Sequence, residues 1–147
     1  MRMEVGRLTF GVLALSILVV AAGCGGSSNP TAPTAAGPAL SFATQIQAQI
    51  LTPACTACHT DDGRTPSGGL NLKAGSAYPS LVGAASSGKA GATRVIAGNP
   101  SGSYLVQKLE GAADIVGLRM PRNGPPYLTD AQVALIRQWI QSGALNN

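Results

Sequence analysis

Cys55-Thr56-Ala57-Cys58-His59 is the stretch that decides the fold of this chain, because it gathers two thiols and an imidazole in five residues. Cysteines three positions apart can each add to one vinyl group of a haem and so form two thioether bonds. A histidine directly after the second cysteine is then held under the iron as the proximal ligand. The run predicts one covalent c-type haem, attached at Cys55 and Cys58 and ligated by His59.

Three other readings of this motif are weaker. A redox disulfide between Cys55 and Cys58 would need a βαβ context, which the sequence lacks. A zinc site would need at least three protein ligands, and the adjacent Cys58 and His59 cannot easily bind one tetrahedral ion together. A structural disulfide from Cys24 to one cysteine of the pair would leave an odd thiol.

Met120 is the candidate for the second axial ligand. The chain has one histidine, so two histidines from one chain cannot ligate the iron. Of its three methionines, Met1 and Met3 lie in a predicted signal peptide, which leaves Met120. It is followed by Pro121 in a Gly/Pro-rich loop, the kind of backbone that suits a ligand loop. A methionine that fills a gap in the core is the alternative. His/Met ligation would raise the reduction potential.

The N-terminus predicts export. Residues 1–23 combine a basic start, an uncharged apolar run and small residues at its end, which is typical of a secretory signal peptide. A permanent membrane span is the alternative, but the run is shorter than the roughly 20 residues that a span needs. Ala21-Ala22-Gly23-Cys24 resembles a bacterial lipobox, although Ala21 replaces the usual leucine. We therefore expect Cys24 to be lipidated; an incidental cysteine after an ordinary signal is the alternative.

Two further regions follow the signal peptide. Residues 24–39, which begin with Cys24, are rich in Gly, Ser, Pro and Ala, and they predict a flexible tether. Residues 40–147 predict one folded domain. Removal of the signal peptide lowers the net charge from +4 to +3, and no run of Lys or Arg suggests a nucleic-acid partner.

The domain reads as all-α with long loops and no strand alternation. Apolar residues at helical spacing follow Ser41, a candidate N-cap. A short helix is expected over 77–82, and another from about Pro100, which Gly111 ends. The last helix has a capping box at Thr129 and Gln132 and an apolar stripe. That stripe comprises Val133, Ile136 and Ile140, widened by Leu135 and Trp139.

With these motifs in order, residues 40–145 resemble a mono-haem class I cytochrome c domain of the bacterial lipoprotein or planctomycete type. The matching segments are Cys55 to His59, Gly68 to Leu72, Pro100 to Leu105, Met120-Pro121, and Trp139-Ile140 with Gly143-Ala144. The resemblance implies a cytochrome c fold whose N- and C-terminal helices pack around one covalent haem. It also implies electron transfer at a partly exposed haem edge. We expect Pro66 or a nearby glycine to supply the carbonyl that accepts the His59 ring N–H.

The function predicted on these grounds is that of a single-electron carrier and not an enzyme, because a six-coordinate iron leaves no open site for a substrate. Redox proteins are the expected partners, and a small-molecule substrate is not expected. A haem-based sensor and a fixed haem subunit of a larger oxidoreductase remain alternatives. Surface cations such as Lys108, Arg119 and Arg122 are treated as solvated charges; the alternatives are that they rim the haem edge and that Arg119 or Arg122 pairs a haem propionate. We expect the protein to be exported and lipid-anchored, in the periplasm or at the cell surface. The outer membrane is favoured because Gly25 is not the aspartate that, directly after the lipidated cysteine, is associated with retention in the inner membrane.

Overall fold

The computed structural model describes residues 40–61 and 66–147. The predicted signal peptide (1–23) and tether (24–39, with Cys24) lie outside the described residues. Within them the chain forms helices and loops and no strand, as the sequence predicts; isolated bridges pair Val82 with Val95 and Ala85 with Thr93. None of the helices in the described ranges is long and apolar enough to cross a bilayer.

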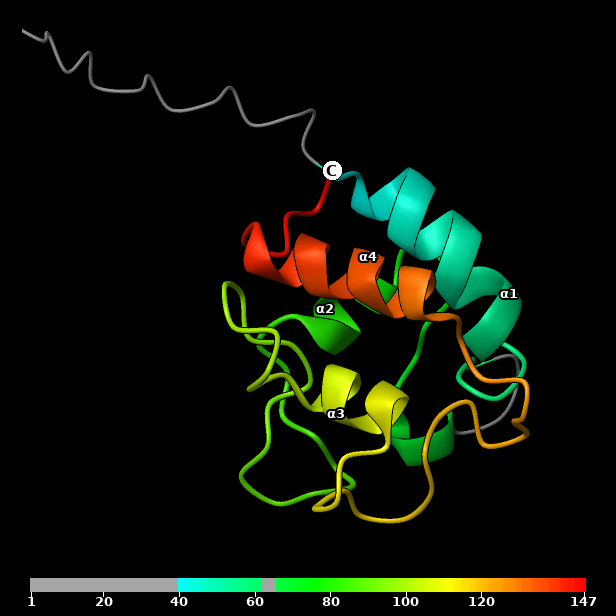
Figure 1. Cartoon of the computed structure of the whole chain (residues 1–147). Helices are drawn as coiled ribbons and strands as arrows, with labels where there is room; N and C mark the ends of the chain where they lie inside the picture. The colour runs from blue at the N-terminus through cyan, green and yellow to red at the C-terminus, as the bar shows by residue number, and fades with distance from the viewer. Residues whose placement is uncertain (1–39, 62–65) are drawn as a thin grey trace, which may run out of the picture. The chain divides into compact units, whose positions relative to one another are not determined.

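Helices η1 (Phe42–Leu51) and α1 (Thr52–Cys55) run on from one another and carry the chain into the cysteine motif (Figure 1). Ser41 caps η1 as predicted, since its hydroxyl accepts the Thr44 N–H at 3.2 Å. The hydrogen bonds of η1 follow the wider π pattern, shown by the Thr52 N–H that donates to Gln47 O five residues back. The residues that η1 buries are Phe42, Ile46, Gln47, Ile50 and Leu51.

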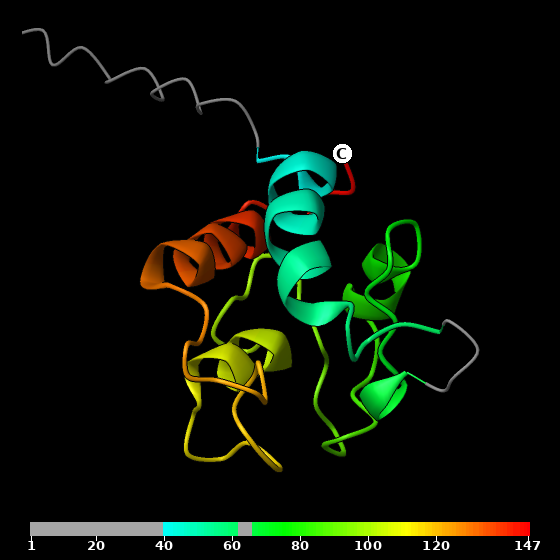
Figure 2. The ribbon, with the colours of Figure 1, turned by 90° about the vertical axis from the view of Figure 1, so that its right-hand side faces the viewer.

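Helix α4 (Asp130–Gln141) crosses η1, and the two helices form the centre of the core (Figures 1 and 2). Its capping box is present: the Thr129 hydroxyl accepts the Gln132 N–H, and the Gln132 side chain accepts the Thr129 N–H. The predicted stripe packs inward, and Ile136 and Ile140 are fully buried. This confirms the predicted contact between the first and last helices.

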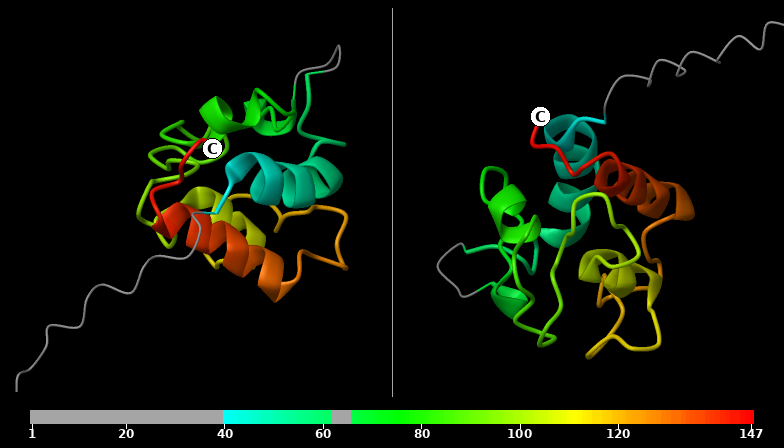
Figure 3. Two further views of the ribbon diagram at one scale, coloured as in Figure 1. Left: turned by 90° about the horizontal axis from the view of Figure 1, so that it is seen from above. Right: turned by 90° about the vertical axis from the view of Figure 1, so that its left-hand side faces the viewer.

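Phe42 joins three helices at the top of the core. Its ring lies 5.1 Å from that of Trp139 in α4 and meets the ring of Tyr78 edge-on at 5.4 Å. Tyr78 belongs to α2 (Ala77–Leu81), which forms where the sequence predicts a short helix. Figure 3 shows the corresponding arrangement, with η1 between α2 and α4. A single aromatic side chain thus fixes both neighbours of the helix that leads to the cysteines.

Helix α3 (Tyr104–Glu110) begins later than the sequence predicts. The Asn99 side chain accepts the Gly102 N–H at 2.9 Å, so Pro100 and the next two residues form a separate turn. Ser103 becomes the residue before the helix, and its hydroxyl is used by Ile96 and Asn99 instead of capping α3. Gly111 ends the helix with φ at 73°, as predicted.

The two ends of the described domain are bonded to each other. The Ala43 N–H donates to Asn147 O at 2.9 Å, and the Phe42 N–H donates to the Asn147 side chain at 2.9 Å. The Ser41 hydroxyl also donates to Asn147 O, at 3.0 Å. The C-terminal residue therefore supplies acceptors to the first turn of η1, whose N–H groups have no partner within the helix.

Candidate haem-binding site

One turn brings the two cysteines and the histidine together. Cys55 ends α1, and its carbonyl accepts the N–H groups of Cys58 (3.2 Å) and His59 (3.0 Å). Both cysteines are free thiols; Cys55 is half-buried and Cys58 is exposed. Burial, with a smaller contribution from Cys58, raises the pKa of the Cys55 thiol to about 11. The pair therefore presents one sheltered and one accessible sulfur to a haem.

The His59 ring is held by the backbone that follows it. Its Nδ1 lies 2.8 Å from Ser67 O, which can only accept, so Nδ1 carries the proton. The Ser67 N–H in turn donates to Cys58 O at 3.2 Å. An acceptor for the His59 ring N–H is thus present as expected, but it is Ser67 O, so the prediction of Pro66 or a glycine was wrong. Nε2, which has no partner among the described residues, is the nitrogen left for a metal.

Arg94 fixes the segment that holds His59. Its guanidinium donates to Gly68 O and Gly69 O at 3.1 Å each, and to Ser80 O at 2.9 Å. Gly68 and Gly69 both have positive φ, which suits glycine at these positions. Sequence reasoning missed Arg94 because three of its partners are backbone carbonyls, which any residue type can supply.

Met120 is held by α3 and not by the cysteine turn. Its N–H donates to Lys108 O at 2.8 Å, and its half-buried side chain packs against the hydrophobic core. It lies in the Met120 loop, which we define as residues 112–128, between α3 and α4. The described contacts place Met120 and His59 on separate elements.

Two cations that the sequence analysis treated as solvated are bound to backbone carbonyls. The Lys108 ammonium donates to Val116 O at 2.9 Å and to Leu118 O. Arg119 donates from Nε to Leu109 O at 2.7 Å, and its guanidinium lies 4.1 Å from the centre of the Tyr127 ring. Both contacts secure the Met120 loop, so the prediction of solvated charges was wrong for these two residues.

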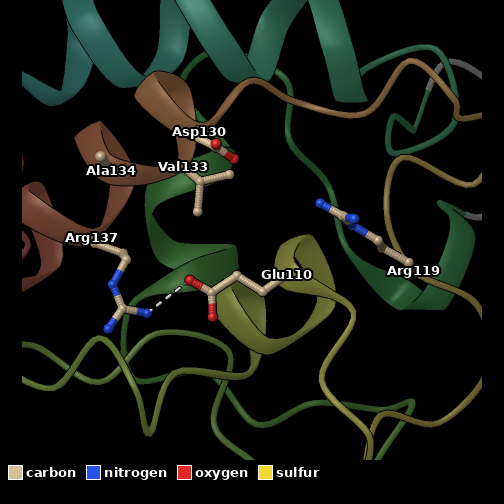
Figure 4. Close-up of a pocket in the computed structure, with 6 residues that line it drawn as sticks. All are labelled: Glu110, Arg119, Asp130, Val133, Ala134 and Arg137. Atoms are coloured by element: carbon tan, nitrogen blue, oxygen red, sulfur yellow. Dashed lines mark hydrogen bonds and ion pairs between the residues drawn. The ribbon is translucent and has the colours of Figure 1, made fainter.

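A cavity of about 300 Å³ opens between the end of α3 and the start of α4 (Figure 4). Arg119 and Arg137 face Glu110 and Asp130 across it, and Arg137 pairs with Glu110 at 2.9 Å. Its lining carries equal numbers of acidic and basic side chains, which does not favour an ion of either sign.

The residues fit a covalently attached haem. Two unpaired thiols and a histidine with its outer nitrogen unoccupied lie on one turn. In an independent comparison, the family model described as cytochrome c matches residues 28–144 of the chain, most of its length. No curated protein and no solved structure gave a significant match.

Proposed function

The chain belongs to the cytochrome c family, and from this premise we propose that it is a single-electron carrier whose iron is ligated by His59 and Met120 and whose N-terminus is lipidated at Cys24. Members of the family bind c-type haem covalently, and the positions of Cys55 and Cys58 fit the attachment motif. The haem supplies a one-electron Fe(II)/Fe(III) couple. The residues of the chain attach it, orient it and set that couple's potential.

The single observation that carries the proposal is the bond between His59 Nδ1 and Ser67 O, at 2.8 Å. It fixes the tautomer and leaves Nε2 without the proton, as a ligand nitrogen must be. A hydrogen bond at the far ring nitrogen also raises the basicity of the ligating one. Such a histidine is suited to permanent ligation, which an electron carrier requires.

The anchorage of Met120 supports the proposal that the iron has six ligands and no open position. Its loop is bonded to α3 at Met120 itself and at Val116, Leu118 and Arg119 before it. A thioether held in place as the sixth ligand favours Fe(II) and leaves no position for a substrate. Electron transfer, rather than bond chemistry on a small molecule, is the activity that such a site supports.

The first experiment is a visible spectrum of the protein co-expressed with a c-type maturation system. We expect haem that remains attached through denaturation, a weak far-red Met–Fe(III) band when oxidised, and no CO binding when reduced. Met120→Ala should lose the far-red band and bind CO. Met120→His is the matched control, because it restores a sixth ligand without a thioether. CO binding by the unaltered protein would favour a gas sensor and refute Met120 ligation.

The lipid anchor is tested separately. We propose that the protein is exported and held by acyl chains on Cys24, because the sequence around Cys24 resembles a lipobox and several acyl chains anchor stably. The outer membrane is favoured because Gly25 follows the lipidated cysteine. Cys24→Ser should abolish the acyl mass increment and release the protein from the membrane fraction. A soluble unaltered protein without acyl mass would contradict the anchor and leave the haem proposal intact.

A further inference from the structure

Helix α3 presents two polar side chains to the Met120 loop from one face. Tyr104 and Lys108 are four residues apart, so they lie on the same side of the helix. The Tyr104 hydroxyl accepts the Val116 N–H at 2.9 Å, and the Lys108 ammonium donates to Val116 O at the same distance. Both polar backbone groups of Val116 are thus bound by α3.

Lys108 makes two further bonds to the segment that leads into Met120. Its ammonium also donates to Leu118 O, and its own carbonyl accepts the Met120 N–H at 2.8 Å. One residue therefore bonds to the loop two and four positions before Met120 and at Met120 itself. A lysine whose ammonium was wholly solvated would not make the two bonds to Val116 O and Leu118 O.

The anchorage of Lys108 is itself firm. It lies in the middle of α3, between Tyr104, Val106 and Leu109, which are buried in the core. The loop it holds is by contrast exposed, since Val116 and Leu118 are 56% and 59% exposed. The Lys108 bonds thus join an exposed surface segment to a packed helix just before Met120, whose sulfur the segment has to position.

We propose that Lys108 is a positioning residue that keeps Met120 on the iron, and that its ammonium sets the population of protein in which Met120 is displaced. The inference rests on the proposed His59 and Met120 ligation. Without the ammonium, Val116 O and Leu118 O turn to water. The loop then keeps the bonds that the Val116 N–H donates to the Tyr104 hydroxyl, Arg119 Nε to Leu109 O and the Met120 N–H to Lys108 O. Met120 then leaves the iron more often, although every ligand residue is still present.

Lys108→Leu removes the ammonium and keeps much of the apolar stem. In the holoprotein we expect a weakened far-red Met–Fe(III) band, a lower reduction potential and a CO-binding fraction about tenfold larger, which corresponds to about 1.4 kcal/mol. Lys108→Arg, which retains donors for both carbonyls, should restore most of the band. Arg137→Leu is the matched control, because it also removes one positive charge but bonds to Glu110 and Ser101 and not to the Met120 loop.

The outcomes separate the two proposals. If the unaltered protein shows the far-red band and Lys108→Leu keeps that band and still excludes CO, Lys108 does not position Met120. If the unaltered protein lacks the band, the ligation itself is refuted and the inference falls with it. Lys108→Gln, which keeps one amide donor group, replaces Lys108→Leu if the latter does not fold. An intermediate band in that variant supports the inference, and an unchanged band overturns it.

Discussion

Replacing Trp139 tests the contact between the first and last helices. Its side chain is 1% exposed, its ring lies 5.1 Å from that of Phe42, and its indole N–H donates to Leu145 O at 2.9 Å. Trp139→Ala loses all three contributions, and burial of this size predicts a cost of about 3–5 kcal/mol. Trp139→Phe keeps a ring against Phe42 and loses the hydrogen bond and some volume, for about 1–2 kcal/mol.

The assay is urea unfolding of the holoprotein followed by far-UV circular dichroism, with midpoint and slope compared among variants. Leu145→Ala is the control: it removes a side chain that is 49% exposed and keeps the carbonyl that Trp139 binds. We expect it to change the free energy of unfolding by less than about 0.5 kcal/mol. A Trp139→Ala cost below about 1 kcal/mol, or equal costs for the two Trp139 variants, would refute the reasoning.

Three further changes test separate parts of the structure. Thr129→Ala removes the capping box of α4 and should cost about 1 kcal/mol in urea unfolding. The hydrogen bond and charge of Lys89 hold the pKa of Asp114 below its usual 3.8. The stability that this interaction contributes is present above pH 3.8 and is lost as pH falls through the lowered pKa. Asp114→Asn should therefore slightly flatten the loss of stability towards acid pH. Arg94→Lys replaces a guanidinium that reaches its three carbonyls from two separate nitrogens by a single ammonium; it should lose part of these bonds and speed amide hydrogen exchange at Ser67.

The helices that begin or end the domain could be predicted because their signals are local. Ser41 and Thr129 are cap residues whose partners lie three positions away, and Gly111 stops a helix by its own conformation. The apolar stripe of α4 likewise depends only on spacing. The start of α3 was predicted wrongly because the Asn99 side chain binds the Gly102 N–H, a competition between two local structures of similar sequence signature.

The site was predicted less completely than the fold. The types and spacing of Cys55, Cys58 and His59 are enough to predict haem attachment. Their individual roles stay predictions that the spectra test. The residues that hold the site in place were missed. Ser67 binds His59 through its carbonyl, Arg94 binds carbonyls of the segment that follows His59, and Lys108 binds carbonyls of the Met120 loop. Any residue type can offer a carbonyl, so sequence alone does not identify these partners.

The bonds between Asn147 and the first turn of η1 suggest that the order of segments along the chain can be changed without changing the fold. A short peptide link from Asn147 to Ser41 would join residues already in hydrogen-bond contact, so the domain is a candidate for circular permutation. A permutant opened in the exposed turn at Gly88 would be synthesised with Met120 ahead of Cys55 and His59. The packing would be unchanged while the attachment motif left the ribosome after Met120 instead of before it, which would separate the order of synthesis from the contacts that the fold requires.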